Sequence, residues 1–550
     1  MRNRNEGLSP SSNDQTVKAA RRMVPNLATA GRWKRGSITL TAITLVILIA
    51  FGLRAFNIDS AWNVFIDEIN YLHVSQGVLQ TGWVIGANGP FYLHPPAFFY
   101  LEAGYMKLFG IGGDTLQQIY SVRYLNAALG ALMAAALLWS GRQLGGWAAG
   151  IAAATIFALN PYAIRMNERN LLETPTMLWV LLGYVMLFSA LVRNDRVSWP
   201  RVVAAGVMFG LALLTKDLSA FVTLVPLGVC FAVGWALPRL KTFAIGVIAM
   251  VVYIPYPLAV YLVGDWSLFV EQKFTGVSRL AGLLQITGFN KTGGPSLVGK
   301  IISLVGEFGT TYLLLGTGAV AVCILLFTGI GRTPARRLLL TWAASSYLFL
   351  AYLTFFGTLE DPFFYYLLVP AMLTTVVTVA LILQSLWANG LSHHLHTARR
   401  GLLAVEAVAA ILVASLIIWD MYYWGVVHTS PDNGYEHVDT YVEGLPEDSR
   451  IGVTSQVTEI IVEDHVGEDR YNSAQGLRND NVEYVVISKK LATEGWGQPR
   501  GKLYAWIKDN GELAYSFEAR SDGRFEVWQL QDDDTDPASS KATQAAADGR

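Results

Sequence analysis

Long apolar runs separated by short polar loops fill most of the first 424 residues, and they constrain the fold more than any other feature of the sequence. A helix needs roughly 20 apolar residues to cross the hydrocarbon core of a bilayer. We divide Val202–Leu237 at the polar Thr215–Asp217, because this stretch is too long for one crossing. The sequence therefore predicts an α-helical polytopic membrane protein with about eleven transmembrane helices, near Ser37–Leu53, Ser121–Ser140, Leu144–Leu159, Pro175–Val192, Val202–Thr215, Leu218–Leu237, Thr242–Val263, Ile301–Ile330, Leu338–Phe356, Phe363–Leu386 and Leu402–Trp424.

The loop charges predict an orientation, because basic residues of short loops collect on the cytoplasmic side. Every second loop is basic: "GRQLGG", "VRNDRVSWPR", "PRLK", "GRTPARR" and "SHHLHTARR". The other loops are acidic, aromatic or longer. We expect a multi-pass protein of the cytoplasmic (plasma) membrane, with a cytoplasmic N-terminus and an extracytoplasmic C-terminus. Residues 1–36 are polar and basic and lack the pattern of a removable signal, so they predict a disordered cytoplasmic tail.

The composition changes to that of a soluble domain at about Gly425. Four short runs, "RIGVTS", "VEYVVIS", "ELAYSFEA" and "RFEVWQL", are typical of strands. They predict a small extracytoplasmic α/β domain over residues 425–530, after a transmembrane domain over residues 37–424. Residues 531–550 are acidic and poor in apolar side chains, which indicates disorder. The two cysteines, Cys230 and Cys323, give no sign of a disulfide framework.

Polar residues are concentrated in the loops that we place outside the membrane. The long first loop, residues 54–120, contains "VFIDEINYLHVSQG" and "GANGPFYLHPPAFFY", and later outer loops contain "NPYAIRMNERNLLETPTM", "TKD" and "LEDPFFYY". Ionisable groups are costly inside a membrane and commonly mark functional sites. These loops predict one cleft at the outer face, with candidate residues Asp67, Glu68, Tyr71, His94, Arg123, Arg165, Arg169, Glu173 and Lys216.

This set suits transfer of a group from a lipid phosphate. A carboxylate in a partly desolvated site can have a raised pKa and take a proton from an attacking hydroxyl or amine. Neighbouring cations can hold a phosphate that leaves as an anion. The apolar segments "PFYL" and "PPAFFYL" could lie on the bilayer surface and shield the cleft from water.

Several motifs together resemble the GT-C membrane glycosyltransferases, in the phospholipid-carrier-dependent branch that contains protein O-mannosyltransferases and the aminoarabinose transferase of lipid A. The matching pieces are "IDEINY", "HPPAFFY", "RNLLETP", "GLALLTKDLSAFVTLVPL" and "FFYYLLVPAM", within Arg54–Pro370. The resemblance implies inverting transfer of a sugar from a polyprenyl-phosphate donor to a lipid, protein or glycan acceptor. No nucleic-acid partner is expected.

The resemblance also assigns roles to residues. Asp67 aligns with the family's proposed base and has Glu68 beside it. Lys216 falls where a lysine lies close to the carrier phosphate. Glu173 replaces a more usual aspartate, which leaves metal binding open. A divalent metal, if present, would be held by Asp67, Glu173 and His94, although no His/Cys cluster supports one.

Structural interpretations stand beside these functional ones. Asp67 and Glu68 also suit the solvated start of a helix, where acids are favourable. His94, Glu173 and Tyr71 would shape the site, although His94 precedes two prolines and also suits a rigid turn. The outer arginines, Arg123, Arg165 and Arg169, would contact phosphate or sugar or act as interfacial anchors. Lys216 could equally extend to the membrane surface. We expect Glu360 and Asp361 to be a capping or loop feature.

Other functions remain open at this point. A transporter or flippase of a lipid-linked or small substrate would have a similar number of helices, although its polar groups usually lie at mid-membrane between two repeats. A membrane sensor would bind its ligand in the C-terminal domain, but it would not need so many polar loops. Within enzymes, an oligosaccharyl- or phospholipid-transferring enzyme of the same architecture is the alternative.

Overall fold

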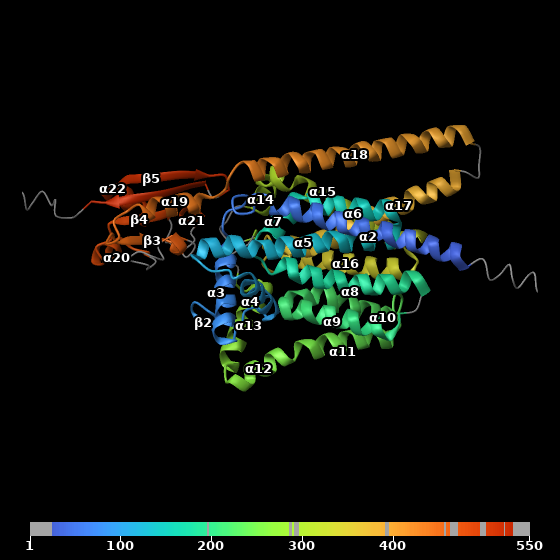
Figure 1. Ribbon diagram of the computed structural model, residues 1–550, viewed down its shortest axis with the longest axis horizontal. Helices are drawn as coiled ribbons and strands as arrows, with labels where there is room; N and C mark the ends of the chain where they lie inside the picture. The colour runs from blue at the N-terminus through green and yellow to red at the C-terminus, as the bar shows by residue number, and fades with distance from the viewer. Residues whose placement is uncertain are drawn as a thin grey trace, which may run out of the picture.

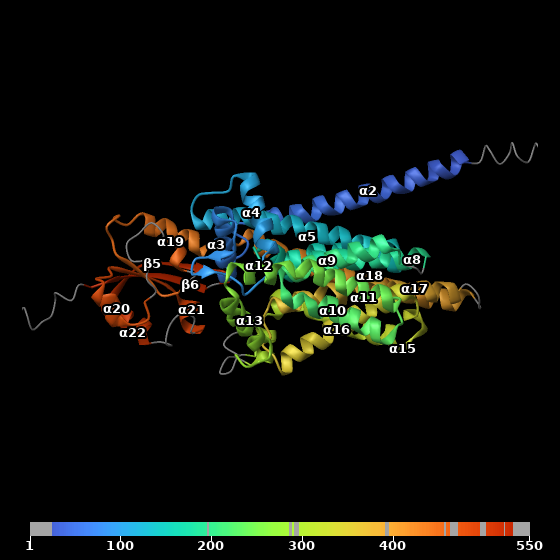
Figure 2. The same ribbon diagram turned by 90° about the horizontal axis from the view of Figure 1, so that it is seen from below.

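The protein is described here by a computed structural model that covers residues 25–194, 197–284, 289–290, 296–390, 395–455, 458–461, 471–494, 502–521 and 523–531. Most of its helices run side by side along the long axis of the molecule (Figure 1). A small sheet with short helices lies at one end of this helical body, and the N-terminal end of the first helix lies at the other (Figures 1 and 2).

All eleven expected apolar runs are helical. They correspond to α2 (Pro25–Ala55), α5 (Thr115–Gly145), α6 (Trp147–Leu159), α8 (Glu173–Asn194), α9 (Trp199–Thr215), α10 (Ala220–Val233), α11 (Arg239–Tyr253) with α12 (Pro255–Val263), α15 (Val305–Phe327), α16 (Pro334–Phe355), α17 (Phe363–Gly390) and α18 (Leu395–Thr429). Among the described residues, seven helices are long and apolar enough to cross a membrane. The number becomes eight if α6 and the following α7 (Pro161–Glu168), bent by 63°, form one span. The chain is thus a multi-pass membrane protein, and the count of eleven spans stays a prediction.

Several helices begin earlier than expected, among them α2, α5 and α18. Helix α2 begins at Pro25, so residues 25–36 are helical where we expected a tail. Proline suits the first turn of a helix, and no proline interrupts the following residues. Helix α5 begins at Thr115, because the Asp114 carboxylate accepts a hydrogen bond from the backbone N–H of Gln117 at 2.6 Å. The remaining tail, residues 1–24, and residues 532–550 lie outside the described residues.

The interior of the helical body is closely packed. Tyr184 of α8 stacks on Trp342 of α16 with ring centroids 4.1 Å apart. Helix α9 approaches α11 at Gly210, where an added Cβ would lie 2.5 Å from the Cβ of Val252. Such contacts fix the helix ends that carry the polar loops.

The first long loop folds into elements of its own. It contains α3 (Ile66–Thr81), the hairpin of β1 (Ile85–Gly86) and β2 (Gly89–Pro90), and α4 (Ala97–Phe109). Helix α3 packs closely on the hairpin, since a Cβ at Gly77 would lie 1.9 Å from the carbonyl oxygen of Ile85. Two later helices, α13 (Trp266–Leu280) and α14 (Leu297–Ser303), lie at the same end of the body (Figures 1 and 2).

The C-terminal domain is built on a four-stranded sheet in the order β3-β4-β6-β5. The four predicted strands are confirmed as β3 (Ile451–Val453), β4 (Tyr484–Ser488), β5 (Gly511–Ala519) and β6 (Gly523–Leu530). Strands β3 and β4 are parallel, and the other pairs are antiparallel. The accompanying helices are α19 (Gly434–Glu443), α20 (Ala474–Asn479), α21 (Lys489–Glu494) and α22 (Lys502–Asn510), with the 3-10 helix η3 (Thr458–Ile461). Two further 3-10 helices, η1 (Asp217–Ser219) and η2 (Gly329–Gly331), belong to the helical body. This domain shares a hydrophobic core with α3, in which Ile69 and Leu72 pack with Val438 and Phe525.

Candidate active site

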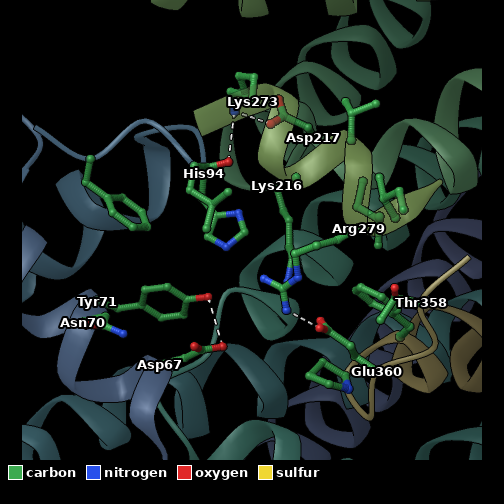
Figure 3. Close-up of a pocket in the computed structure, with 18 of the residues that line it drawn as sticks. Asp67, Asn70, Tyr71, His94, Lys216, Asp217, Lys273, Arg279, Thr358 and Glu360 are labelled. Carbon is green, nitrogen blue, oxygen red and sulfur yellow. Dashed lines mark hydrogen bonds and ion pairs between the residues drawn. The ribbon is translucent and has the colours of Figure 1, made fainter. Parts of the chain in front are cut away.

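A cavity of about 380 Å³ lies between α3, α13, the chain after α9 and the loop before α17 (Figure 3). Apolar side chains line part of its wall, including Phe91, Leu93 and Phe363. Its charged lining residues are Asp67, Asp217, Glu360, Lys216, Lys273 and Arg279. The structure therefore brings acids and cations from four separate segments of the chain into one site.

Asp67 lies in the first turn of α3 and faces the cavity. The Tyr71 hydroxyl, one helical turn later, donates a hydrogen bond to its Oδ2 at 3.4 Å. Burial raises the pKa of Asp67 to about 6, while the positive charge of Lys216 acts in the opposite direction. The carboxylate is therefore mostly ionised at pH 7 and can accept a proton.

Lys216 lies opposite Asp67 and is held by Glu173. The backbone at Lys216 is extended, with φ −154°, because α9 ends at Thr215 before η1 begins. Its ammonium group forms an ion pair with the carboxylate of Glu173, the first residue of α8. Glu173 is almost fully buried, so Lys216 has a fixed counter-ion behind it and exposes its charge to the cavity.

Helix α13 supplies two cations that the sequence analysis did not single out. Lys273 forms an ion pair with Asp217 and donates a hydrogen bond to the carbonyl oxygen of Leu93 at 3.2 Å. Arg279 forms an ion pair with Glu360 (Figure 3). The sequence contained one indication of these two cations. The segment "EQKFTGVSR" places basic residues in a loop predicted to be extracytoplasmic, where basic residues are under-represented.

Two candidate shaping residues, His94 and Tyr71, line the same cavity. The His94 ring meets the edges of Tyr71 and Phe91, with centroids 5.9 and 6.0 Å away. Burial, together with the positive charges of Lys216, Lys273 and Arg279, lowers the pKa of His94 well below its ordinary value. The imidazole is therefore neutral at pH 7 and can serve as a hydrogen-bonding wall of the site.

Glu68 and Arg123 do not lie in the cavity, although we expected catalytic and phosphate-binding roles for them. Both side chains are fully buried, and Arg123 donates to both carboxylate oxygens of Glu68 at 2.9 Å. Successive helical residues point about 100° apart, so Asp67 faces the cavity while Glu68 faces α5. Arg123 also donates to the carbonyl oxygens of Ile58 and Trp62, which leaves it bound entirely by the protein.

Arg165 and Arg169 also lie outside the residues that line the cavity. Arg165 forms an ion pair with Asp361 and lies 3.9 Å from Glu307. Arg169 donates a hydrogen bond to the side-chain oxygen of Asn63. These contacts fix the segment between α7 and α8, so the expected contact of these arginines with the donor phosphate is not part of the site.

Glu360 and Asp361 lie in the loop before α17, as expected, and each also forms an ion pair. Glu360 lines the cavity and binds Arg279, whereas Asp361 turns to the opposite side and binds Arg165. The two residues lie where the loop turns into α17, with the carbonyl oxygens of Glu360 and Asp361 accepting hydrogen bonds from the N–H groups of Phe363 and Phe364. Glu360 therefore joins the candidate site.

The described residues contain no group of three or more His, Cys, Asp or Glu side chains placed to hold a metal ion. Of the three expected ligands, Glu173 is paired with Lys216, and His94 is surrounded by three cations. This donor set does not fit a metal held by Asp67, Glu173 and His94.

Solved structures of other proteins share the fold of this chain. The chain is similar to ArnT from Cupriavidus metallidurans bound to undecaprenyl phosphate, with 16% identity over 90% of this chain and 98% of that chain and a TM-score of 0.55. It is also similar to the oligosaccharyltransferase AglB from Archaeoglobus fulgidus in complex with an inhibitory peptide and a dolichol-phosphate, with 14% identity over 91% and 75% of the two chains and a TM-score of 0.58. The fold is that of the GT-C membrane glycosyltransferases.

A family match gives a more particular assignment. Residues 89–278 match the family of dolichyl-phosphate-mannose-protein mannosyltransferases. This segment includes His94, Glu173, Lys216 and Lys273, and it ends one residue before Arg279. No curated protein sequence matches the chain significantly. The match covers 190 of the 550 residues, and together with the fold it supports a GT-C glycosyltransferase over a transporter or a sensor.

Proposed function

We propose that this enzyme transfers a sugar from a polyprenyl-phosphate donor to an acceptor on the extracytoplasmic face, with inversion at the anomeric carbon. The observation that carries the proposal is the cavity that places the Asp67 carboxylate opposite the cations Lys216, Lys273 and Arg279. Undecaprenyl phosphate and dolichol-phosphate in the two similar structures support a carrier of this kind.

Asp67 acts as the general base in this mechanism. Its carboxylate takes the proton from the acceptor hydroxyl or amine while the acceptor oxygen or nitrogen forms a bond to the anomeric carbon. The bond from that carbon to the phosphate oxygen breaks, and the electron pair leaves with the polyprenyl phosphate. Attack from the side opposite the phosphate inverts the configuration.

The cations stabilise the charge that develops on the leaving phosphate. Lys216 is held in place by Glu173, so its position does not have to be organised during the reaction. Lys273 pairs with Asp217 and Arg279 pairs with Glu360, and the phosphate would bind beside these pairs. Charge-assisted hydrogen bonds of this kind are about twice as strong as neutral ones.

The orientation of the molecule forms part of the proposal. Basic loops at one end of the helical body favour a cytoplasmic location for that end. The cavity and the C-terminal domain would then lie at the extracytoplasmic face of the plasma membrane. A lipid, a protein or a cell-envelope glycan would reach Asp67 from that side.

Replacement of the proposed base tests the function directly. We expect Asp67→Asn to reduce transfer from undecaprenyl-phosphate-linked sugars to envelope acceptors by 10²–10⁴-fold, the typical contribution of a general base. The measurement is incorporation of labelled sugar, with a panel of donors and membranes from cells that lack this chain as acceptor. Binding of undecaprenyl phosphate should persist, because the cations remain.

Asp59→Asn is the matched control, since Asp59 is an exposed acid in the same loop. It should transfer as the wild type does. Full transfer by Asp67→Asn would remove Asp67 as the base, and absence of transfer by the wild type with every carrier-linked sugar would contradict the proposed function itself.

A further inference from the structure

We infer that the C-terminal domain positions the catalytic helix through Asp432 and Arg520, which together latch the segment 57–65 in front of α3. This inference rests on the proposed role of Asp67, and it gives the C-terminal domain a function in the reaction. The segment joins α2 to α3 and ends one residue before the helix that carries Asp67.

Asp432 binds the backbone of this segment at two points. Its N–H donates to the carbonyl oxygen of Ser60 at 2.7 Å, and its Oδ2 accepts from the N–H of Asn63 at 3.2 Å. Asp432 is 1% exposed, so water competes little for these bonds. Its Oδ1 accepts a further hydrogen bond, at 2.9 Å, from the N–H of Ser521, which follows β5.

Arg520 completes the latch from the same end of β5. Its guanidinium donates to the carbonyl oxygen of Ala61 and lies 3.5 Å from the carboxylate of Asp432. It also lies over the Trp62 ring, 4.9 Å from the centroid. The two latch residues therefore bind four consecutive residues of the segment, Ser60 to Asn63.

The helical body binds the other side of the same segment. The Trp62 indole N–H donates to Oε2 of Glu168 at 2.6 Å, and Arg123 donates to the carbonyl oxygen of Trp62 at 3.0 Å. Residues 57–65 are thus held between the membrane part and the C-terminal domain. Loss of the latch would free one side while leaving the bonds of Arg123 in place.

The latch differs in position from the groups that would bind the phosphate. Lys216, Lys273 and Arg279 belong to other segments and form ion pairs with Glu173, Asp217 and Glu360, none of which is a latch residue. A misplacement of about 1 Å can reduce a reaction rate on the order of 100-fold. Loss of the latch should therefore reduce kcat without weakening binding of the carrier.

The test uses the full chain in detergent or nanodiscs, with Asp432→Asn and Arg520→Ala as variants. Arg524→Ala is the control, because Arg524 belongs to the same domain but pairs with Glu526 at 3.3 Å, away from the segment. The readouts are kcat for transfer, the Kd for undecaprenyl phosphate, the Tm, and hydrogen exchange of the peptide that contains residues 57–66.

We expect faster exchange of this peptide in both latch variants and a kcat lower by about 10- to 100-fold. The Kd should stay within twofold of the wild type, as in Arg524→Ala, whereas the Tm should fall in Arg520→Ala, which leaves the buried carboxylate of Asp432 without its cation. Unchanged exchange and kcat would overturn the inference, and so would a parallel loss of kcat, carrier binding and Tm, which would indicate general unfolding. If the wild type transfers no sugar, the proposed function fails, and the exchange result alone decides whether the latch exists.

Discussion

Two adjacent acids, Asp67 and Glu68, show how much the chemistry of a carboxylate depends on the face of the helix it occupies. Asp67 shares a cavity with the cations of the site, whereas Glu68 lies in a fully buried pair with Arg123. Glu68 also accepts a hydrogen bond from the N–H of Asn170 at 2.8 Å and caps the backbone of Phe65. Asp67 can therefore change its charge during a reaction, while Glu68 fixes the start of α3.

The raised pKa of Asp67 predicts the pH dependence of the reaction. The base must be ionised to accept a proton. The value of kcat/KM should therefore rise with pH, reach half of its maximum near pH 6, and become constant at higher pH. Below that midpoint the protonated carboxyl is inactive, and the rate should fall about tenfold per pH unit. Initial rates from pH 4.5 to 8 at constant ionic strength would show this. A rate that is constant from pH 5 to 7 would contradict a base of this pKa.

Removal of the charge of Glu68 predicts a loss of stability. Glu68→Gln leaves the guanidinium of Arg123 buried without a counter-ion, which costs about 3–5 kcal/mol in comparable buried pairs. Thermal unfolding in detergent should show a clear decrease in Tm. The matched variant Asp67→Asn should keep the wild-type Tm while it loses transfer, and equal stability of the two variants would argue against this division of roles.

At the scale of elements, helix α13 supplies two of the three cations that line the cavity. It carries Lys273 and Arg279 to the wall opposite α3, and Gly276 and Val277 line the cavity between them. Burial lowers the pKa of Lys273, and Asp217 offsets this effect. The helix thus supplies charge where a lipid phosphate would enter.

Loss of either cation of α13 should weaken binding of the carrier. A charge-assisted hydrogen bond contributes about 1.5–3 kcal/mol, so Lys273→Ala and Arg279→Ala should each raise the Kd for undecaprenyl phosphate by roughly tenfold or more. Equilibrium binding of the labelled carrier measures the effect. Lys107→Ala, at an exposed position of α4, is the control and should bind as the wild type does. Unchanged binding in both α13 variants would place the phosphate elsewhere.

Patterns that depend on local sequence were predictable, and those that depend on folding of loops were not. Apolar runs predicted the eleven helices, and alternation predicted the four strands of the C-terminal domain. The motifs singled out Asp67, Lys216 and Glu173, which the structure places near one another, while their roles stay predictions. The sequence did not show that α13 folds back over the cavity or which face of α3 Glu68 occupies, because these depend on packing between distant segments. The phase of the helix alone indicates that two adjacent acids cannot face the same cavity.

At the scale of the whole molecule, the C-terminal domain lies at one end of the helical body, and α3, α4 and α13 lie between it and the long helices (Figures 1 and 2). The first loop is therefore covered on one side by the membrane part and on the other by the sheet domain. A reaction at this end would take place at one membrane face.

Cysteine labelling tests the proposed orientation. Glu512→Cys, exposed on β5, should react with a membrane-impermeant maleimide in intact cells. Arg332→Cys, in the basic loop before α16, should react after the cells are permeabilised. The background should carry Cys323→Ser, because Cys323 is exposed, whereas Cys230 is buried. The reverse pattern would invert the proposed topology.

The charged residues that line the cavity, three acids and three cations, cancel in formal charge. A sugar phosphodiester would bring one negative charge, and the polyprenyl phosphate that remains after transfer carries two. The proton removed from the acceptor stays on Asp67 and balances this additional charge, so the total charge inside the cavity is the same before and after the reaction. The reaction therefore adds no net charge to the cavity. An added charge would be costly there, because the dielectric constant of a protein interior is low. It follows that the proton and the spent carrier should leave in linked steps, and that release of the carrier should become faster as the pH rises.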